Sequence, residues 1–481
     1  MKLFRRSLVA SAALTLAACA TTAPPTPAVL LQAPAAWQAP LPHQGSLQAL
    51  AQWWTRLNDP LLVELIASAQ AVSPGLAQAQ SRVAQARASQ VASRAALGPT
   101  LDGQAQASRG FNEQLATLAS TAQAGLQARW EIDLFGANAA AASAAGHRLA
   151  GAQALWHEAR VSVAAEVAQQ TSSLRTCLAQ WALAERDAHS RSETARLGTL
   201  SEQAGFTAPA TAALARASAS DGAARAAQQR MQCDVDTKAL VALTGWEEPA
   251  LRERLQAAPP PAAPDGLFAI ATVPAQVLAQ RPDLYNAERE VAAARADLDQ
   301  AQAQRYPHLS LSGTVGAAWV RTGGVTTDLS TWSLGPLALS VPLLDGGRRL
   351  AQADAAQARY IEAAALYDAR ARQAVSEVEQ ALVRLQATGA RSESARSAAS
   401  GYRASLEAAT ARWRVGLASL VELEDARRTA LAAESALLAL QHERQLAWIA
   451  LYRAAGGGWD ASAPEPTALP STASATPRAM P

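Results

Sequence analysis

The chain has little of what marks several common classes of protein. Lysine occurs only at Lys2 and Lys238, and the 42 basic and 40 acidic residues are mixed along the chain, so the formal net charge is only +2. The absence of a basic block argues against nucleic acid as a partner. Although 49% of the 481 residues are hydrophobic, no run of 18 apolar residues follows the N-terminal segment. A bundle of transmembrane helices is thereby excluded.

The sequence also lacks the motifs of enzyme chemistry. It contains no GxSxG element, no phosphate-binding P-loop and no dinucleotide-binding fingerprint. Its histidines show no metal-ligand spacing, and we expect surface or packing roles for all six: His43, His147, His157, His189, His308 and His442. We therefore predict that the protein is not an enzyme and that it holds no metal and no cofactor.

The N-terminus has the layout of an export signal. Residues 1–18 combine a basic start, an apolar stretch and small residues. The run Leu16-Ala17-Ala18-Cys19 resembles the lipobox of bacterial lipoproteins. That resemblance implies removal of a lipoprotein signal peptide and attachment of diacylglycerol and an acyl chain such as palmitate to Cys19. The alternative is an ordinary signal peptide whose cleavage zone contains a cysteine.

Both ends of the mature chain have a linker-like composition. Residues 19–59 are rich in proline and alanine and are expected to form a lipid-anchored extended segment. The tail, 460–481, has the same character and is expected to be disordered. Ala20, where some sorted lipoproteins carry aspartate, is typical of lipoproteins sent to the outer membrane.

The chain consists of two copies of one unit. Pro74 and Pro282 lie 208 residues apart, and matched residues continue at almost the same offset as far as Gly245 and Gly456. The predicted repeats are 60–245 and 274–459, joined by a linker at 246–273. Each repeat is expected to contain one helix, two strand-like runs, a very long helix and a return helix: 60–95, 138–202 and 208–245 in the first, 274–304, 348–413 and 418–455 in the second.

The strand-like runs have one apolar and one polar face. Residues 122–134 alternate in this way, as do 309–319 and, after a change of phase at Gly335-Pro336, 337–343. An amphipathic strand over a soluble core is the alternative, but such long strands suit a tilted crossing of a bilayer. Four strands cannot close around water, and open edges are not tolerated in lipid. We therefore expect a mixed fold of α-helices and a transmembrane β-barrel, shared by three chains that supply twelve strands.

Several motifs carry a resemblance to a known family. The chain resembles the TolC-like outer-membrane factors, and within them the NodT-type lipoproteins that work with RND efflux pumps. The matching motifs are Trp53-Trp54-x-Arg56-Leu57-x-Asp59-Pro60-Leu61, Gln280-Arg281-Pro282-Asp283-Leu284, Val341-Pro342-Leu343-Leu344-Asp345-Gly346-Gly347-Arg348 and Leu451-Tyr452-Arg453-Ala454-x-Gly456-Gly457-Gly458-Trp459. The resemblance implies a homotrimer with a twelve-stranded barrel and a periplasmic α-helical barrel. It also implies a periplasmic adaptor and an inner-membrane RND pump as partners.

The same resemblance implies a gate. The segment that runs from Trp413 to Arg428 resembles the turn and return helix where the family has a constriction, which makes Val421 the constricting residue and Asp425 and Arg428 gate residues. The alternative for the last two is a solvated ion pair on one helix face. Gly205 and Gly416 are predicted to form the turns at the periplasmic tips, where φ is positive.

Two cysteines lie symmetrically about one of these turns. Cys177 and Cys233 are each 28 residues from Gly205, which places them at the same height on two antiparallel helices. In an oxidising periplasm this predicts a disulfide, the alternative being two buried, reduced cysteines. The second repeat has Thr388 and Arg444 at the equivalent positions, so the bridge would belong to one half.

The predicted function is that of a passive outer-membrane exit duct for drugs or other small molecules in a tripartite RND-type efflux system of a Gram-negative bacterium. Two alternatives stay open on the sequence. The duct could serve type I protein secretion, or the chain could be a lipid-anchored periplasmic coiled-coil scaffold without a pore.

Overall fold

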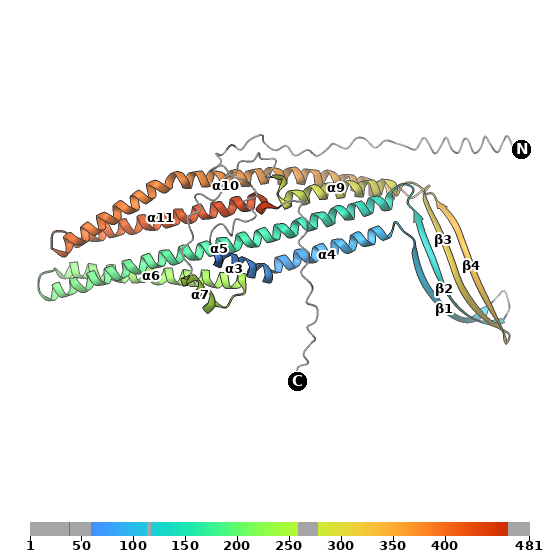
Figure 1. The fold of residues 1–481 in the computed structure, drawn as a ribbon, viewed down its shortest axis with the longest axis horizontal. Coiled ribbons are helices and arrows are strands. Elements are labelled where there is room, and N and C mark those ends of the chain that lie inside the picture. The colour runs from blue at the N-terminus through green and yellow to red at the C-terminus, as the bar shows by residue number, and fades with distance from the viewer. Residues whose placement is uncertain (1–37, 39–58, 113–116, 258–277, 460–481) are drawn as a thin grey trace. The chain divides into compact units, whose positions relative to one another are not determined.

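The computed structural model describes residue 38 and residues 59–112, 117–257 and 278–459. Cys19, most of the predicted N-terminal segment and the predicted tail at 460–481 lie outside these residues. Within them the chain forms helices and one antiparallel sheet (Figure 1).

The first predicted helix is two helices. α3 spans Pro60–Val72 and α4 spans Pro74–Ala95. Ser73 between them is extended, with ψ of 118°, because a residue before proline is pushed out of the helical region and Pro74 has no N–H to donate. The Oγ of Ser73 accepts a hydrogen bond from the Leu76 amide and so caps α4. The expectation of one helix over 60–95 was wrong at this position.

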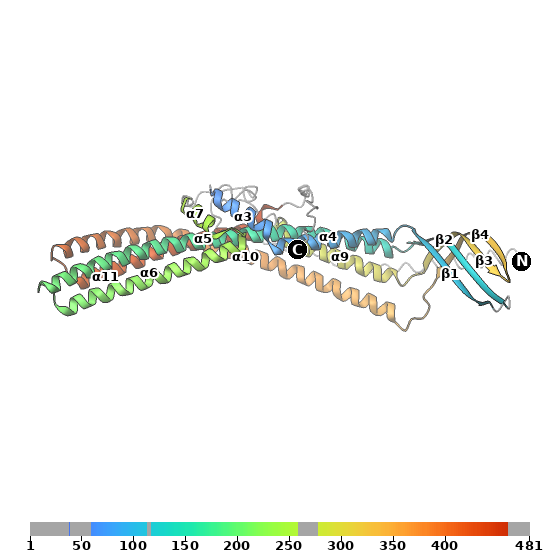
Figure 2. The ribbon, with the colours of Figure 1, turned by 90° about the horizontal axis from the view of Figure 1, so that it is seen from below.

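Two long antiparallel helix pairs follow. α5 (Ala137–Gln203) pairs with α6 (Pro209–Thr244), and α10 (Arg348–Arg414) pairs with α11 (Leu420–Ala454) (Figures 1 and 2). α5 and α10 have 67 residues each, which corresponds to about 100 Å. Alanine at many buried positions allows their backbones to approach closely.

Three shorter helices complete the helical part. α9 (Pro282–Ala303) lies against α5 and α10, and a single 3₁₀ turn, η3 (Gly456–Gly458), follows α11. α7 (Glu248–Ala257) lies within the segment that the sequence predicts as a linker. Part of that linker is therefore helical, with Leu251 fully buried.

The helix pairs turn at glycines. Gly205 and Gly416 have φ of +78° and +77°, a conformation that costs little only for glycine. The return helices then start at good caps: Pro209 is the first residue of α6, and Ser419 forms a reciprocal capping box with Glu422 on α11.

The sheet contains four strands in chain order. β1 (Thr100–Asn112), β2 (Thr117–Ile132), β3 (His308–Thr322) and β4 (Val325–Ser340) lie side by side and antiparallel (Figure 1). Because direct partners share a face, the pairing gives one largely apolar and one polar face. Among the four strands β1 and β4 have one free edge each.

An extra residue in β4 explains the change of phase in the sequence. Leu311 pairs with Leu337 but Gly313 pairs with Leu334, so three steps on β4 match two on β3. The bulge keeps Leu334 and Leu337 on the apolar face. β4 ends at Ser340 and β2 at Ile132, so the ends predicted at 343 and 134 were too late.

The main core lies where the two repeats meet. It joins α3, α5, α6, α7, α10 and α11, and its fully buried leucines are Leu61, Leu65, Leu174, Leu240, Leu251, Leu382 and Leu451. By length and composition no single described helix could cross a membrane, whereas α3 and α4, bent by 52° at their junction, pass that test as a pair. α3 is half of this pair and contributes five buried residues to the core.

Candidate functional site

The predicted gate residues lie in the first turns of α11. Val421 is the second residue of the helix and 64% of its surface is exposed. Arg428 forms an ion pair with Asp425 on the same helix, and their side chains are 76% and 64% exposed. Within one chain the two charges thus form the solvated helix pair that the sequence offered as the alternative, and most of the Val421 surface is exposed to solvent.

Apolar side chains are exposed at both tips. Phe206 follows the turn glycine of the first pair, and Val415 and Leu417 flank Gly416 in the second; all three are largely exposed. Together with Val421 they form what we call the tip patch. Exposed apolar groups at the end of a helix pair are typical of a surface that another protein covers.

A buried charge cluster lies next to the tips, and it was not predicted from the sequence. Arg191 on α5 donates from Nε to Asp187 at 2.8 Å and from Nη1 to the Glu424 carboxylate on α11 at 2.5 Å. Arg427 on α11 donates to Glu424 at 2.5 Å and to the hydroxyl of Thr194 on α5 at 3.1 Å. Arg191 and Arg427 are only 5% and 3% exposed.

A third helix completes the cluster. Ser218 on α6 donates to Glu424 at 2.7 Å and lies 2.6 Å from Arg191 Nη1. Burial and the neighbouring charge of Arg191 lower the pKa of Arg427, and Glu424 and Asp187 counteract them. The cluster therefore ties the first-repeat pair to the second-repeat pair close to the predicted gate.

One glycine could have revealed the cluster. Gly222 lies inside α6, where glycine is unfavourable, and a Cβ there would lie 2.8 Å from Cδ of Arg191. A side chain at position 222 would collide with the Arg191 side chain, which explains the glycine.

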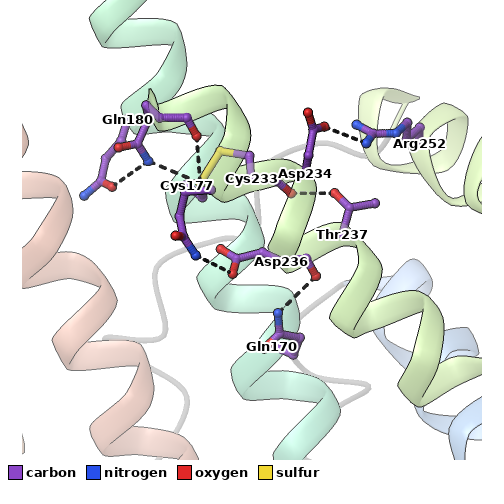
Figure 3. The surroundings of a disulfide bond; sticks show 10 residues. Gln170, Cys177, Gln180, Cys233, Asp234, Asp236, Thr237 and Arg252 are labelled. Atoms are coloured by element: carbon purple, nitrogen blue, oxygen red, sulfur yellow. Dashed lines mark hydrogen bonds and ion pairs between the residues drawn. A yellow bond between two sulfur atoms is a disulfide. The ribbon is translucent and has the colours of Figure 1, made fainter. Parts of the chain in front are cut away.

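The two cysteines are bonded to each other in the structure. Cys177 on α5 and Cys233 on α6 form a disulfide with their Cα atoms 5.5 Å apart, and both are buried (Figure 3). Close to the bond Gln170 Nε2 donates to the Asp236 carbonyl, and Gln229 Nε2 donates to Gln180. These contacts hold α5 against α6 at mid-length.

At the equivalent positions the second repeat has a hydrogen bond within α10 and one between α11 and α10. Thr388 is fully buried on α10 and donates to the Arg384 carbonyl at 2.8 Å. Arg444 on α11 donates to the Leu385 carbonyl at 3.2 Å. Only the first-repeat pair therefore has a covalent bond across it.

The opening and closing motifs of the second repeat contact each other. Arg281, which is buried, donates to Asp283, to Glu377 at 2.8 Å and to the Ala454 carbonyl at 3.0 Å. Burial alone would lower the pKa of Arg281, but the hydrogen bonds and charges of Asp283 and Glu377 outweigh it, so the pKa is raised. A Cβ on Gly456 would lie 2.2 Å from the Gln280 carbonyl oxygen, which explains the glycine there.

The polar face of the sheet is tied by cross-strand hydrogen bonds. Ser108 lies 2.7 Å from Thr121, Gln123 donates to Gln106 at 3.3 Å, and Thr314 lies 2.8 Å from Ser333. The apolar face instead leaves large side chains exposed, among them Leu101, Leu126, Trp130, Val315, Trp332, Leu337 and Leu339. A sheet with one polar and one apolar face fits an interface between water and lipid.

The described residues contain no group of three metal-ligating side chains that could hold a metal ion. Their arrangement is one of helix pairs, tips and a two-faced sheet.

Two stretches of the chain, residues 65–246 and 273–457, match the family described as outer membrane efflux protein. The chain is 31% identical to the outer membrane protein OprJ of Pseudomonas aeruginosa over 433 residues, which cover 87% of this chain and 88% of OprJ. It is 28% identical to the toluene efflux pump outer membrane protein TtgI of Pseudomonas putida, over 84% of this chain and 87% of TtgI.

The fold is shared with solved structures of such proteins. The crystal structure of the outer membrane protein VceC from Vibrio cholerae aligns with a TM-score of 0.73 at 26% identity, covering 85% of this chain and 99% of VceC. The resemblance that the motifs indicated is thereby confirmed. The chain belongs to the outer membrane efflux protein family, a family of TolC-like channels, and not of enzymes, in the outer membrane of Gram-negative bacteria.

Proposed function

We propose that three copies of this chain form a passive exit duct through the outer membrane. The four-stranded sheet is the observation that carries the proposal. Its strands are 13 to 16 residues long, its faces differ in polarity, and β1 and β4 each have an unpaired edge. Lipid does not tolerate such edges, and three sheets joined β4 to β1 would close a barrel of twelve strands with the polar face inward.

The helix pairs would continue this barrel into the periplasm. Side by side, three sets of α5, α6, α10 and α11 would enclose a tube about 100 Å long. Val421 from each copy would form an apolar constriction, and Asp425 and Arg428 would set its resting width by pairing within or between copies. The exposure of all three side chains in one chain supports this role.

The partners follow from the tips and from the relatives. The tip patch offers apolar surface to a periplasmic adaptor, through which an inner-membrane RND pump would deliver substrate. The name of TtgI assigns that relative to a toluene efflux pump, which favours small apolar molecules over secreted proteins as the cargo. A diacylglycerol and an acyl chain on Cys19 would tether each copy to the membrane.

Two measurements on the purified, detergent-solubilised protein test the proposal. Native mass spectrometry should give three times the mass of one chain, and planar bilayers should show discrete conductance steps. A trimer without conductance, even after Asp425→Ala and Arg428→Ala, would favour the pore-less scaffold. A protein that conducts but restores secretion of a protein substrate, and not drug efflux, in a channel-deficient strain would favour the secretion duct.

A further inference from the structure

Charge on the apolar face of the sheet is confined to one end. Among the described strand residues this face carries three charged side chains, namely Arg109 on β1, Arg321 on β3 and Asp328 on β4. All three lie near the hairpin ends of their strands and far from the ends that join the helices. The remaining acidic residues and arginines of the strands point to the polar face: Asp102, Arg129 and Glu131.

The two arginines lie in one row. Arg109 pairs with Ser120 on β2, and Ser120 pairs with Arg321 on β3, so the three side chains stand on one face at the same level. With one strand between them, the arginine Cα atoms are about 10 Å apart, a gap that two long side chains can close. Both arginines are exposed, and within the described residues neither forms a hydrogen bond or an ion pair.

The row stands at the edge of an apolar band. From Leu309 to Trp319 this face of β3 carries only apolar or small residues. Those residues span about 33 Å along the strand and about 25 Å along the normal of a membrane that the strands cross at 40°, which is the height of the apolar band in outer-membrane barrels. Trp319 then lies at the lipid–water interface, where tryptophan is enriched, and Arg321 lies just beyond it.

We propose that Arg109 and Arg321 bind the phosphate groups of a phosphorylated lipid headgroup in the outer leaflet. This inference rests on the proposed function, because it needs the apolar face to contact lipid. Guanidinium groups bind phosphate oxygens through two parallel hydrogen bonds, and Ser120 adds a hydroxyl between them. Asp328, one row nearer the middle beside Trp319, reduces the charge of the face but leaves it positive.

The test uses a bis-phosphorylated glycolipid, lipid A, and the same glycolipid without its phosphates. Full-length protein would be reconstituted in phosphatidylcholine nanodiscs with either lipid, and the lipid retained per protein would be counted by native mass spectrometry after mild delipidation. Each arginine is expected to raise affinity about 5-fold, so Arg109→Gln with Arg321→Gln should weaken retention of lipid A about 25-fold. The dephosphorylated lipid should be retained weakly by both proteins.

Arg129→Gln is the matched control, since it removes one charge from the polar face of the same sheet and should leave retention unchanged. Equal retention of both lipids by the unmodified protein, or equal losses in the Arg129 and Arg109/Arg321 variants, would overturn the lipid site. Conductance and trimer mass are measured on each sample. If conductance and trimer mass are intact but the protein retains lipid A no better than the dephosphorylated lipid, the lipid site is wrong and the duct stands. If the unmodified protein shows neither conductance nor a trimer, the duct itself is wrong.

Discussion

Arg191 Nη1 on α5 donates a hydrogen bond of 2.5 Å to Glu424 on α11, although 233 residues separate them in the chain. The contact joins the first repeat to the second within a few turns of the tips. The Arg191 side chain is 6% exposed and that of Glu424 is 17% exposed, so water can replace little of the contact if it is lost.

We expect Arg191→Met to lower the free energy of unfolding by about 3–5 kcal/mol, because Asp187 would be left buried without its partner. Chemical denaturation followed by circular dichroism measures the change. Arg225→Met, at an exposed helix pair with Asp221, is the control and should change stability by less than about 0.5 kcal/mol. Adding Asp187→Leu to Arg191→Met should recover part of the loss. Equal effects at Arg191 and Arg225 would contradict the structural role of the cluster.

The disulfide should stabilise the first helix pair. Replacing Cys177 and Cys233 with alanine opens a loop of 56 residues, and we expect a loss of about 2–4 kcal/mol because the unfolded chain gains freedom. The thermal midpoint of the unmodified protein should fall on addition of a reductant. The double variant is the control, since reductant should leave its midpoint unchanged. If the thermal midpoint of the unmodified protein does not change with reductant and its cysteines react with thiol reagents, the two cysteines are reduced and the disulfide is wrong.

His442 makes the stability depend on pH. Burial lowers the pKa of His442 below its ordinary value of 6.5, against the opposing effect of Asp236, and Ser172 lies 3.1 Å from its ring. As the pH falls through 6.5, His442 becomes protonated in the unfolded chain but stays neutral in the folded chain. Protons therefore favour the unfolded chain, and the free energy of unfolding falls. His442→Gln should flatten this slope between pH 7.5 and the lowered pKa. His189→Gln, at an exposed position, should keep the slope of the unmodified protein.

The two tip glycines should resist replacement by alanine. At φ near +78° a Cβ costs about 1–2 kcal/mol, so Gly205→Ala and Gly416→Ala should each lower the thermal midpoint. Asparagine tolerates this conformation better than alanine, and Gly205→Asn should therefore lose less. A Gly205→Asn protein as unstable as Gly205→Ala would show that space and not backbone conformation is limiting.

Removing the charged residues of the proposed gate should increase the conductance of the channel. Asp425→Ala with Arg428→Ala removes an exposed pair next to Val421, and in planar bilayers we expect a conductance several times that of the unmodified protein, because charge pairs at the aperture would no longer hold it narrow. The matched control replaces Asp221 and Arg225, an exposed pair on α6 away from the tip. Unchanged conductance in the Asp425/Arg428 variant would reduce that pair to a solvated helix contact.

Much of the helical architecture could be predicted from the sequence. The long helices predicted at 138–202 and 348–413 agree to within one residue with Ala137–Gln203 and Arg348–Arg414. Their ends could be predicted because the regular apolar spacing continues until a glycine or proline ends it. The break before Pro74 was missed, although the Ser-Pro pair is its physical signal. In β4 the alternation marked the phase change, but pairing with β3 decides where a strand ends.

The buried cluster and the lipid-facing arginines could not be predicted in the same way. Buried arginines are rare, and the partners of Arg191 and Arg427 come from helices far apart in sequence, so the one local sign of the cluster is the glycine inside α6, Gly222, which names none of the partners. Arg109 and Arg321 become neighbours only through the register of three strands. Arg281 was visible as part of a motif, whereas its contact with the Ala454 carbonyl depends on how the chain ends pack.

Because of the free edges of β1 and β4, one damaged chain would inactivate a trimer that also contains intact chains. In the proposed trimer a chain with a damaged edge strand would still join two intact chains and leave their barrel open, so the defect would be dominant. With equal amounts of intact and damaged chains, only about one trimer in eight would contain three intact copies. A bacterium that expresses both should therefore lose about seven-eighths of its ducts, although half of its chains are intact.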